Sequence, residues 1–170
     1  MKNKNKVNMK KLLFEGLMLL VVLAGYLGIK IYLAEKVYLL EKVIDGDTVI
    51  LTGGVTANLV GVDTKGKGEE SVALSEQYLR TVLFGKNIWF EREGRGANQG
   101  WLWIGCEKAP KFIASDLRKI FSNQWGENPL GCEKGVLINE QIVGMGWSEP
   151  YFEGQRGNLR YEQRLRMAGE

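Results

Sequence analysis

The stretch Val43-Ile44-Asp45-Gly46-Asp47-Thr48-Val49-Ile50-Leu51 decides the fold of this chain. Apolar and mostly β-branched residues stand on both sides of a turn that contains Asp-Gly. Asp-Gly is a preferred hairpin turn and β-branched residues favour strands, so the stretch predicts a strand, a tight turn and a second strand. A strand-like run precedes it at Val37–Leu40, and another follows from Asn58 to the polar pair Asp63-Thr64.

The remainder of the chain alternates helical and extended patterns. Apolar residues recur at helical spacing between Gly68 and Gly85, and Gly85 is expected as the residue that ends this helix.

The order of these motifs resembles the staphylococcal-nuclease-like (thermonuclease) family. The resemblance begins with V-I-D-G-D-T-V followed about fifteen residues later by G-V-D-T, and it extends over residues 37–170. It implies strands at Lys86–Phe90 and Trp101–Ile104, and helices at Leu137–Gly146 and from Tyr161 to Arg166 onward. It implies a five-stranded OB-fold β-barrel carrying about three helices, in an α+β arrangement.

The same resemblance implies calcium-dependent cleavage of DNA or RNA phosphodiesters. A carboxylate-bound cation polarises the phosphate, and arginines stabilise the charge of the transition state. The family's metal-binding positions fall on Asp47, Asp63 and Thr64, with Asp45 nearby, which makes these residues a candidate calcium site. The alternative is that the Asp-Gly-Asp-Thr run is kept for its turn conformation alone.

Three charged catalytic positions of the family are changed in this chain. Asn58 and Gln99 stand where the family has arginines, and Gly66 stands where it has a glutamate. We therefore assign no catalytic residue and interpret the chain as a pseudo-nuclease that needs no cofactor, or calcium if the site is functional. The neighbours that would have to substitute are Arg92 or Arg95 and Glu69 or Glu70.

The amino-acid composition excludes several kinds of catalytic and metal-binding site. The chain has no histidine, which excludes Ser-His-Asp and Cys-His catalysis and any histidine-ligated metal. The net charge of the chain is +3, from 23 Lys and Arg against 20 Asp and Glu. Five of the lysines lie in the first eleven residues, so the rest of the chain has 18 basic residues against 20 acidic ones. Nucleic acid is therefore not expected as a partner of the folded part.

The N-terminal region has the composition of a membrane anchor. A basic tail over residues 1–11 precedes an apolar run over 12–34, long enough as a helix of 23 residues to cross a ~30 Å hydrocarbon core. The run predicts a single transmembrane helix with a cytoplasmic N-terminus and the domain on the periplasmic or extracytoplasmic side. The alternative is a signal peptide cleaved after Val22-Leu23-Ala24.

An inserted segment is expected at residues 105–136, where the family needs only a few residues. Gly-Cys-Glu-Lys occurs near both of its ends, so Cys106 and Cys132 are expected to form a disulfide on an oxidising side of the membrane. The alternative is two free thiols. Between them lies an amphipathic pattern whose aromatic residues Phe112, Phe121 and Trp125 are candidate contacts for a partner, or pack on the domain itself.

Three functions follow from these observations. The first is a catalytically inactive nuclease-like subunit of a membrane-bound complex with integral-membrane partners. The second is a calcium-dependent nuclease on the outer face of the membrane. The third is a non-catalytic OB-fold binder of nucleic acid or oligosaccharide that stacks its ligand on Trp89, Trp101 and Trp103.

Overall fold

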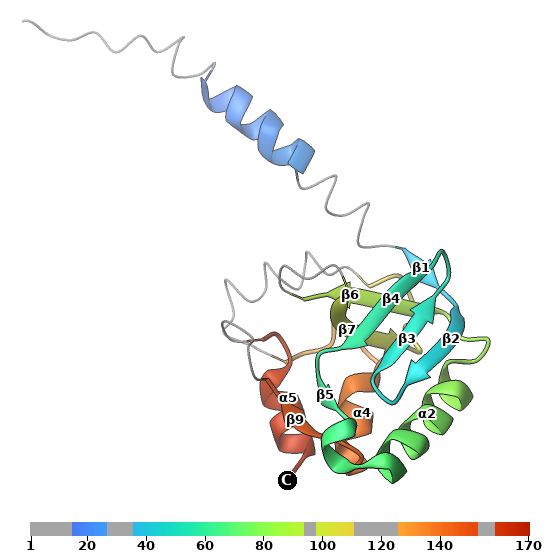
Figure 1. Ribbon diagram of the computed structural model, residues 1–170. Coiled ribbons are helices and arrows are strands. Elements are labelled where there is room, and N and C mark those ends of the chain that lie inside the picture. The colour runs from blue at the N-terminus through green and yellow to red at the C-terminus, as the bar shows by residue number, and fades with distance from the viewer. Residues whose placement is uncertain (1–14, 27–35, 94–97, 111–125, 153–158) are drawn as a thin grey trace, which may run out of the picture. The chain divides into compact units, whose positions relative to one another are not determined.

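The computed structural model describes residues 15–26, 36–93, 98–110, 126–152 and 159–170 (Figure 1). The chain divides into a unit over Met1–Leu33 and a unit over Ala34–Glu170, and each is described by itself. All the strands belong to the second unit.

The helix of the first unit covers residues 15–26. At about 1.5 Å per residue it is shorter than a bilayer core, and no helix in the described part of the chain is long and apolar enough to cross a membrane. The predicted transmembrane helix over 12–34 is therefore not found among the described residues, which hold a helix over 15–26. The flanking parts of the prediction, 12–14 and 27–34, lie outside the described residues.

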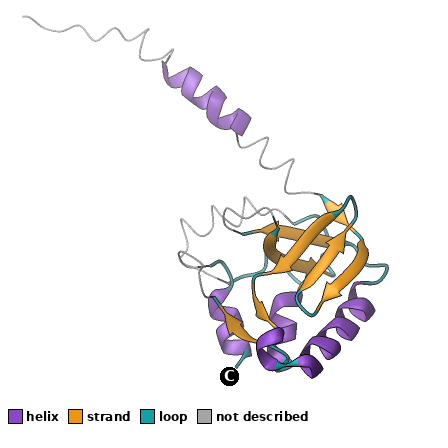
Figure 2. Cartoon of the chain, in the orientation of Figure 1, coloured by secondary structure: helices purple, strands orange, loops and turns teal. Residues whose placement is uncertain are grey.

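The second unit is built from two sheets and the helices packed on them (Figure 2). Its strands are β1 Val37–Tyr38, β2 Leu40–Asp45, β3 Thr48–Leu51, β4 Val55–Leu59, β5 Gly61–Asp63, β6 Ile88–Arg92, β7 Gln99–Ile104, β8 Val136–Leu137 and β9 Glu149–Tyr151. Its helices are α2 Glu69–Leu83, α4 Ile138–Gly144 and α5 Glu162–Ala168, with a 3-10 turn, η1, at Lys65–Lys67.

The larger sheet has seven strands in the order β1-β6-β7-β4-β3-β2, with β8 paired to β7 beside this path. Strands β4 and β7 are parallel, and the other pairs are antiparallel. Strands β5 and β9 form a separate pair. The fold is therefore α+β with mixed sheets.

The predicted closed five-stranded barrel is wrong. The described residues contain four α-helices and an open strand order with β1 and β2 at its ends. The expected strand Val37–Leu40 is divided at Leu39, because β1 pairs with β6 whereas β2 pairs with β3. Local sequence pattern gave no sign of this division.

Several expected elements are present with shifted ends. The helix expected between Gly68 and Gly85 is α2, and Gly85 has a φ of 66°, the left-handed conformation that glycine adopts after a helix. The Asp-Gly hairpin is the β2–β3 connection, in which Asp45 pairs with Thr48.

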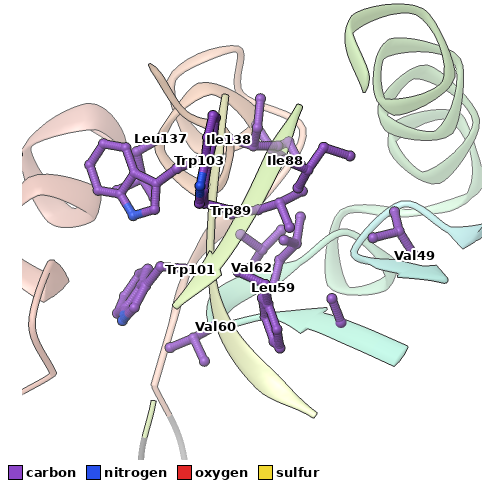
Figure 3. Close-up of a cluster of buried hydrophobic side chains, with 14 of the residues drawn as sticks. Val49, Leu59, Val60, Val62, Ile88, Trp89, Trp101, Trp103, Leu137 and Ile138 are labelled. Carbon is purple, nitrogen blue, oxygen red and sulfur yellow. The ribbon is translucent and has the colours of Figure 1, made fainter. Parts of the chain in front are cut away.

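The hydrophobic core lies between the larger sheet, α2 and the C-terminal helices (Figure 3). Trp101 and Trp103 on β7 are fully buried, and both rings meet the edge of Tyr161 at centroid distances of 5.1 and 5.3 Å. Asn139 on α4 is also fully buried, and its amide donates to the Val60 carbonyl at 2.8 Å and accepts from the Leu102 N–H at 3.0 Å. Each buried polar atom of Asn139 is thus satisfied by a strand backbone.

Candidate functional site

The Asp45-Gly46-Asp47-Thr48 turn is held by its own side chains. The Asp47 N–H donates to Asp45 Oδ1 at 3.3 Å, and Thr48 Oγ1 donates to Asp47 Oδ1 at 2.9 Å. Both carboxyl groups are partly buried. Asp and Thr are favoured in turns because their side chains make such local hydrogen bonds, so this run has a conformational role.

Thr64 packs directly beneath this turn. A Cβ placed on Gly46 would overlap the Thr64 side chain, and Ser75 Oγ on α2 donates to the Gly46 carbonyl at 2.5 Å. Only glycine fits at position 46 without displacing the threonine. The packing brings the β2–β3 turn next to the end of β5, so the structure gathers Asp47, Asp63 and Thr64 in one region. Thr64 Oγ1 is buried, with no hydrogen-bond partner among the described residues.

The candidate ligand oxygens already accept hydrogen bonds within the chain. Asp63 Oδ1 accepts the Gly66 N–H at 3.1 Å, and the Thr64 carbonyl accepts the Lys67 N–H at 3.2 Å. Asp47 Oδ1 accepts from Thr48, as described above. These hydrogen bonds stabilise η1 and the β2–β3 turn. Asp47, Asp63 and Thr64 therefore each have a role in the local conformation of the chain.

The ammonium group of Lys65 lies next to the carboxylates of Asp45, Asp47 and Asp63. Lys65 Nζ is 2.9 Å from Asp45 Oδ2, and its charge also acts on Asp47 and Asp63. The Lys65 side chain is 68% exposed whereas that of Asp45 is 18% exposed, so the ammonium covers the carboxylate from the solvent side.

The carboxyl groups of Asp45 and Asp47 have pKa values displaced in opposite directions. Burial, together with a hydrogen bond to Asp45 and its negative charge, raises the pKa of Asp47 to about 6. Burial also acts to raise the pKa of Asp45, but hydrogen bonds from Lys65, Asp47 and Thr48 outweigh it and lower that pKa. Since the two carboxyl groups share a hydrogen bond, the proton taken up near pH 6 belongs to the pair as a whole.

These residues do not fit a divalent cation in the present arrangement. Within the described ranges, no three acidic or cysteine side chains are grouped closely enough to hold a metal ion. The Asp63 carboxylate is occupied by its own 3-10 turn, and Asp45 is occupied by Lys65. The oxygen atoms that could bind a cation are thus engaged in separate interactions within the chain.

The two positions where the family resemblance predicts arginine carry uncharged side chains. Asn58 on β4 and Gln99 on β7 are register neighbours, so the two positions where arginine is expected from the family resemblance carry amides side by side. Among the described residues, Lys65 is the one cation that shifts the pKa of Asp45 or Asp47. Arg92 is exposed at the end of β6, Glu69 and Glu70 are exposed at the start of α2, and Arg95 lies outside the described residues.

Cys106 and Cys132 form a disulfide at the base of the inserted segment. Asn128 Nδ2 donates to the carbonyls of Cys132 and Gly135 at 3.1 and 2.9 Å. Arg164 of α5 donates to Asn128 Oδ1 at 2.7 Å, and it pairs with Glu140 of α4. The base of the segment is thereby tied to both C-terminal helices. The candidate contacts Phe112, Phe121 and Trp125 lie outside the described residues.

A buried ion pair was missed from sequence. Arg160 and Glu91 form an ion pair, are 4% and 6% exposed, and the Tyr161 hydroxyl donates to Glu91 Oε2 at 3.0 Å. The sequence did contain one indication of this ion pair, because Glu91 follows apolar residues in β6 and a buried charge requires a partner. The identity of that partner was not readable, because Arg160 lies far along the chain.

No family model matches this chain, and no curated protein matches it. The resemblance to the nuclease-like family therefore stays a prediction.

Proposed function

We propose that residues 34–170 form a catalytically inactive, nuclease-like domain that serves as a structural or interaction subunit of a protein complex. The observation that carries this proposal is that Asn58 and Gln99, where the resemblance predicts arginines, are neighbouring amides. The cation that pairs with the carboxylate cluster is Lys65. Phosphodiester cleavage requires positive groups placed where charge develops in the transition state. The loss of one such group typically lowers the rate by ~10²–10³.

The arrangement of the tryptophans argues against the nucleic-acid-binding alternative. Stacking of bases requires exposed aromatic faces. Trp89 is 7% exposed, and Trp101 and Trp103 are fully buried, so all three belong to the core.

The inserted segment supports the interaction part of the proposal. Its base is held by the Cys106–Cys132 disulfide and by the Asn128 hydrogen bonds to the backbone. The chain therefore leaves and re-enters the domain at a fixed base, which lowers the entropic cost of ordering these two ends on a partner.

The absence of catalysis is tested with the purified full chain, with calcium and with single-stranded and double-stranded DNA and RNA. We expect no hydrolysis above that of an Asp47→Asn variant prepared in the same way. Calcium-dependent hydrolysis that Asp47→Asn abolishes would establish the second hypothesis and overturn the proposal.

The interaction part is tested by purifying the tagged full chain from the membrane and soluble fractions of its source cells. We expect a partner in fixed stoichiometry that is lost in the Phe112→Ser/Phe121→Ser/Trp125→Ser variant. Phe84→Ser is the matched control, because Phe84 is 80% exposed on α2's C-terminal side and its loss also removes surface apolar area. Retention of the partner by the triple variant would show that the inserted segment is not the contact.

A further inference from the structure

The carboxylate cluster beneath the β2–β3 turn has a cation built into the chain. Lys65 Nζ lies 2.9 Å from Asp45 Oδ2, and the Lys65 charge acts on Asp45, Asp47 and Asp63 together. We propose that Lys65 is the resident cation of this cluster and that it excludes divalent cations from it. This inference rests on the proposed function, in which the site has lost catalysis.

The backbone places Lys65 for this role. Residue 65 opens η1, whose backbone is held by the Lys67 N–H to Thr64 carbonyl bond at 3.2 Å and the Gly68 N–H to Lys65 carbonyl bond at 3.1 Å. The Gly66 N–H binds Asp63 Oδ1 at the same turn. Because the turn is fixed at several points, the Lys65 side chain begins beside the aspartates and needs little ordering to reach Asp45.

An intramolecular ammonium also competes well with a dissolved ion. Its effective concentration is high because it is tethered next to the carboxylate, whereas a divalent cation must bind from solution and displace it. The buried Thr64 hydroxyl beneath the turn has no hydrogen-bond partner among the described residues.

The neighbouring Lys67 provides a matched control. Lys67 Nζ pairs with Glu149 Oε1 at 2.7 Å, on β9, and does not bind Asp45. Lys65→Met and Lys67→Met change the net charge equally and lie two residues apart on the same turn. Only the first removes the cation from the aspartates.

The test is calorimetric titration of calcium into the full chain at a pH well above 6, where both Asp45 and Asp47 are ionised. We expect Lys65→Met to bind calcium about ten-fold or more tightly than the unmodified chain and the Lys67→Met variant, the size expected for removal of one close charge near a protein surface. Adding Asp45→Asn to Lys65→Met should abolish the gain. Thermal unfolding of every variant establishes that it is folded.

Two results overturn the inference: equal calcium affinity in Lys65→Met and Lys67→Met, or binding by the unmodified chain as tight as by Lys65→Met. Neither result bears on catalysis, which is measured separately by hydrolysis with the unmodified chain. Lys65→Met is expected to remain without nuclease activity, because Asn58, Gly66 and Gln99 are unchanged in it.

Discussion

Two regions of the domain pair a carboxylate with a cation, and they differ in burial. Arg160 and Glu91 are almost completely buried and share their surroundings with the Tyr161 hydroxyl. Lys65 and Asp45 lie at the surface, where the lysine side chain is 68% exposed. The chemistry of the two pairs is similar, but water reaches only the second.

The difference shows how burial decides what an ion pair does. In the interior, an unpaired charge is costly, so the Arg160–Glu91 pair holds the C-terminal segment to β6. At the surface, solvent screens the charges and the pair adds little to stability. Its effect there is local: it sets the charge of the Asp45–Asp47 cluster and the ion that the cluster accepts. The first pair is structural and the second belongs to the candidate site.

The largest effect is expected at the buried pair. Arg160→Met leaves the Glu91 carboxylate buried without its ion partner, so the free energy of unfolding should fall by about 3–5 kcal/mol in urea denaturation. Arg166→Met is the control, since Arg166 forms an exposed ion pair with Glu162 on the same segment and should cost less than about 1 kcal/mol. Equal losses in the two variants would contradict the distinction between the regions.

The disulfide should affect only the region of the buried pair. Replacing Cys106 and Cys132 by serine opens a loop with a sequence separation of 26 and should cost about 3 kcal/mol, mainly by freeing the unfolded chain. Because Asn128 and Arg164 connect this base to α5, amide hydrogen exchange should accelerate in β8 and α5. Amides of the turn at residues 45–48 that exchange by local opening should keep their rates; acceleration of these amides would show that the two regions are coupled.

The pH dependence of stability should originate in the other region. The pKa of Asp47 rises from 3.8 in the unfolded chain to about 6 in the folded one, so the folded state holds this proton more tightly. Its stabilising contribution is complete below about pH 4 and is lost as the pH rises through about 6. After allowance for solvent screening, the loss should be ~1 kcal/mol.

Asp45 acts in the opposite direction at lower pH. Its lowered pKa contributes stability above 3.8 that is lost as the pH falls through its folded pKa. Urea unfolding between about pH 4 and pH 7 isolates the Asp47 effect, which Asp47→Asn should remove and Asp63→Asn should leave. If the free energy of unfolding of Asp47→Asn still falls between about pH 4 and pH 7, the pH dependence originates in another group.

The smallest effect on stability is expected at Lys65. Because the side chain is exposed, Lys65→Met should leave the thermal unfolding midpoint unchanged. It should nevertheless raise the pKa of Asp45, since a hydrogen bond from Lys65 is the main interaction that lowers it. Carboxyl carbon chemical shifts followed against pH measure this change, and Lys67→Met should not reproduce it.

Local pattern predicted the elements whose form depends on neighbouring residues. The Asp-Gly turn and α2 with Gly85 after it could be placed because turn chemistry and helical spacing act over a few residues. Local pattern was wrong about the N-terminal helix and about closure of the sheet. Among the described residues no helix is long and apolar enough to cross a membrane, and strand order depends on which distant edges meet.

The candidate site shows the same division. Sequence placed Asp45, Asp47, Asp63 and Thr64 near one another, and it identified the changed positions Asn58, Gly66 and Gln99. It did not show that Lys65 binds Asp45, because an exposed lysine after a threonine has the composition of any surface turn. Nor did it show that Asn58 and Gln99 are register neighbours.

The sequence by itself determined the local chemistry of this protein: an Asp-Gly-Asp turn, two cysteines, no histidine and amides at two positions where arginines are expected. Only the tertiary structure decided which charges meet. It paired Glu91 with Arg160 in the core and Asp45 with Lys65 at the surface, across separations that no local pattern spans. The physical reason is that burial and distance set the strength of a charge interaction, and both are properties of the folded chain.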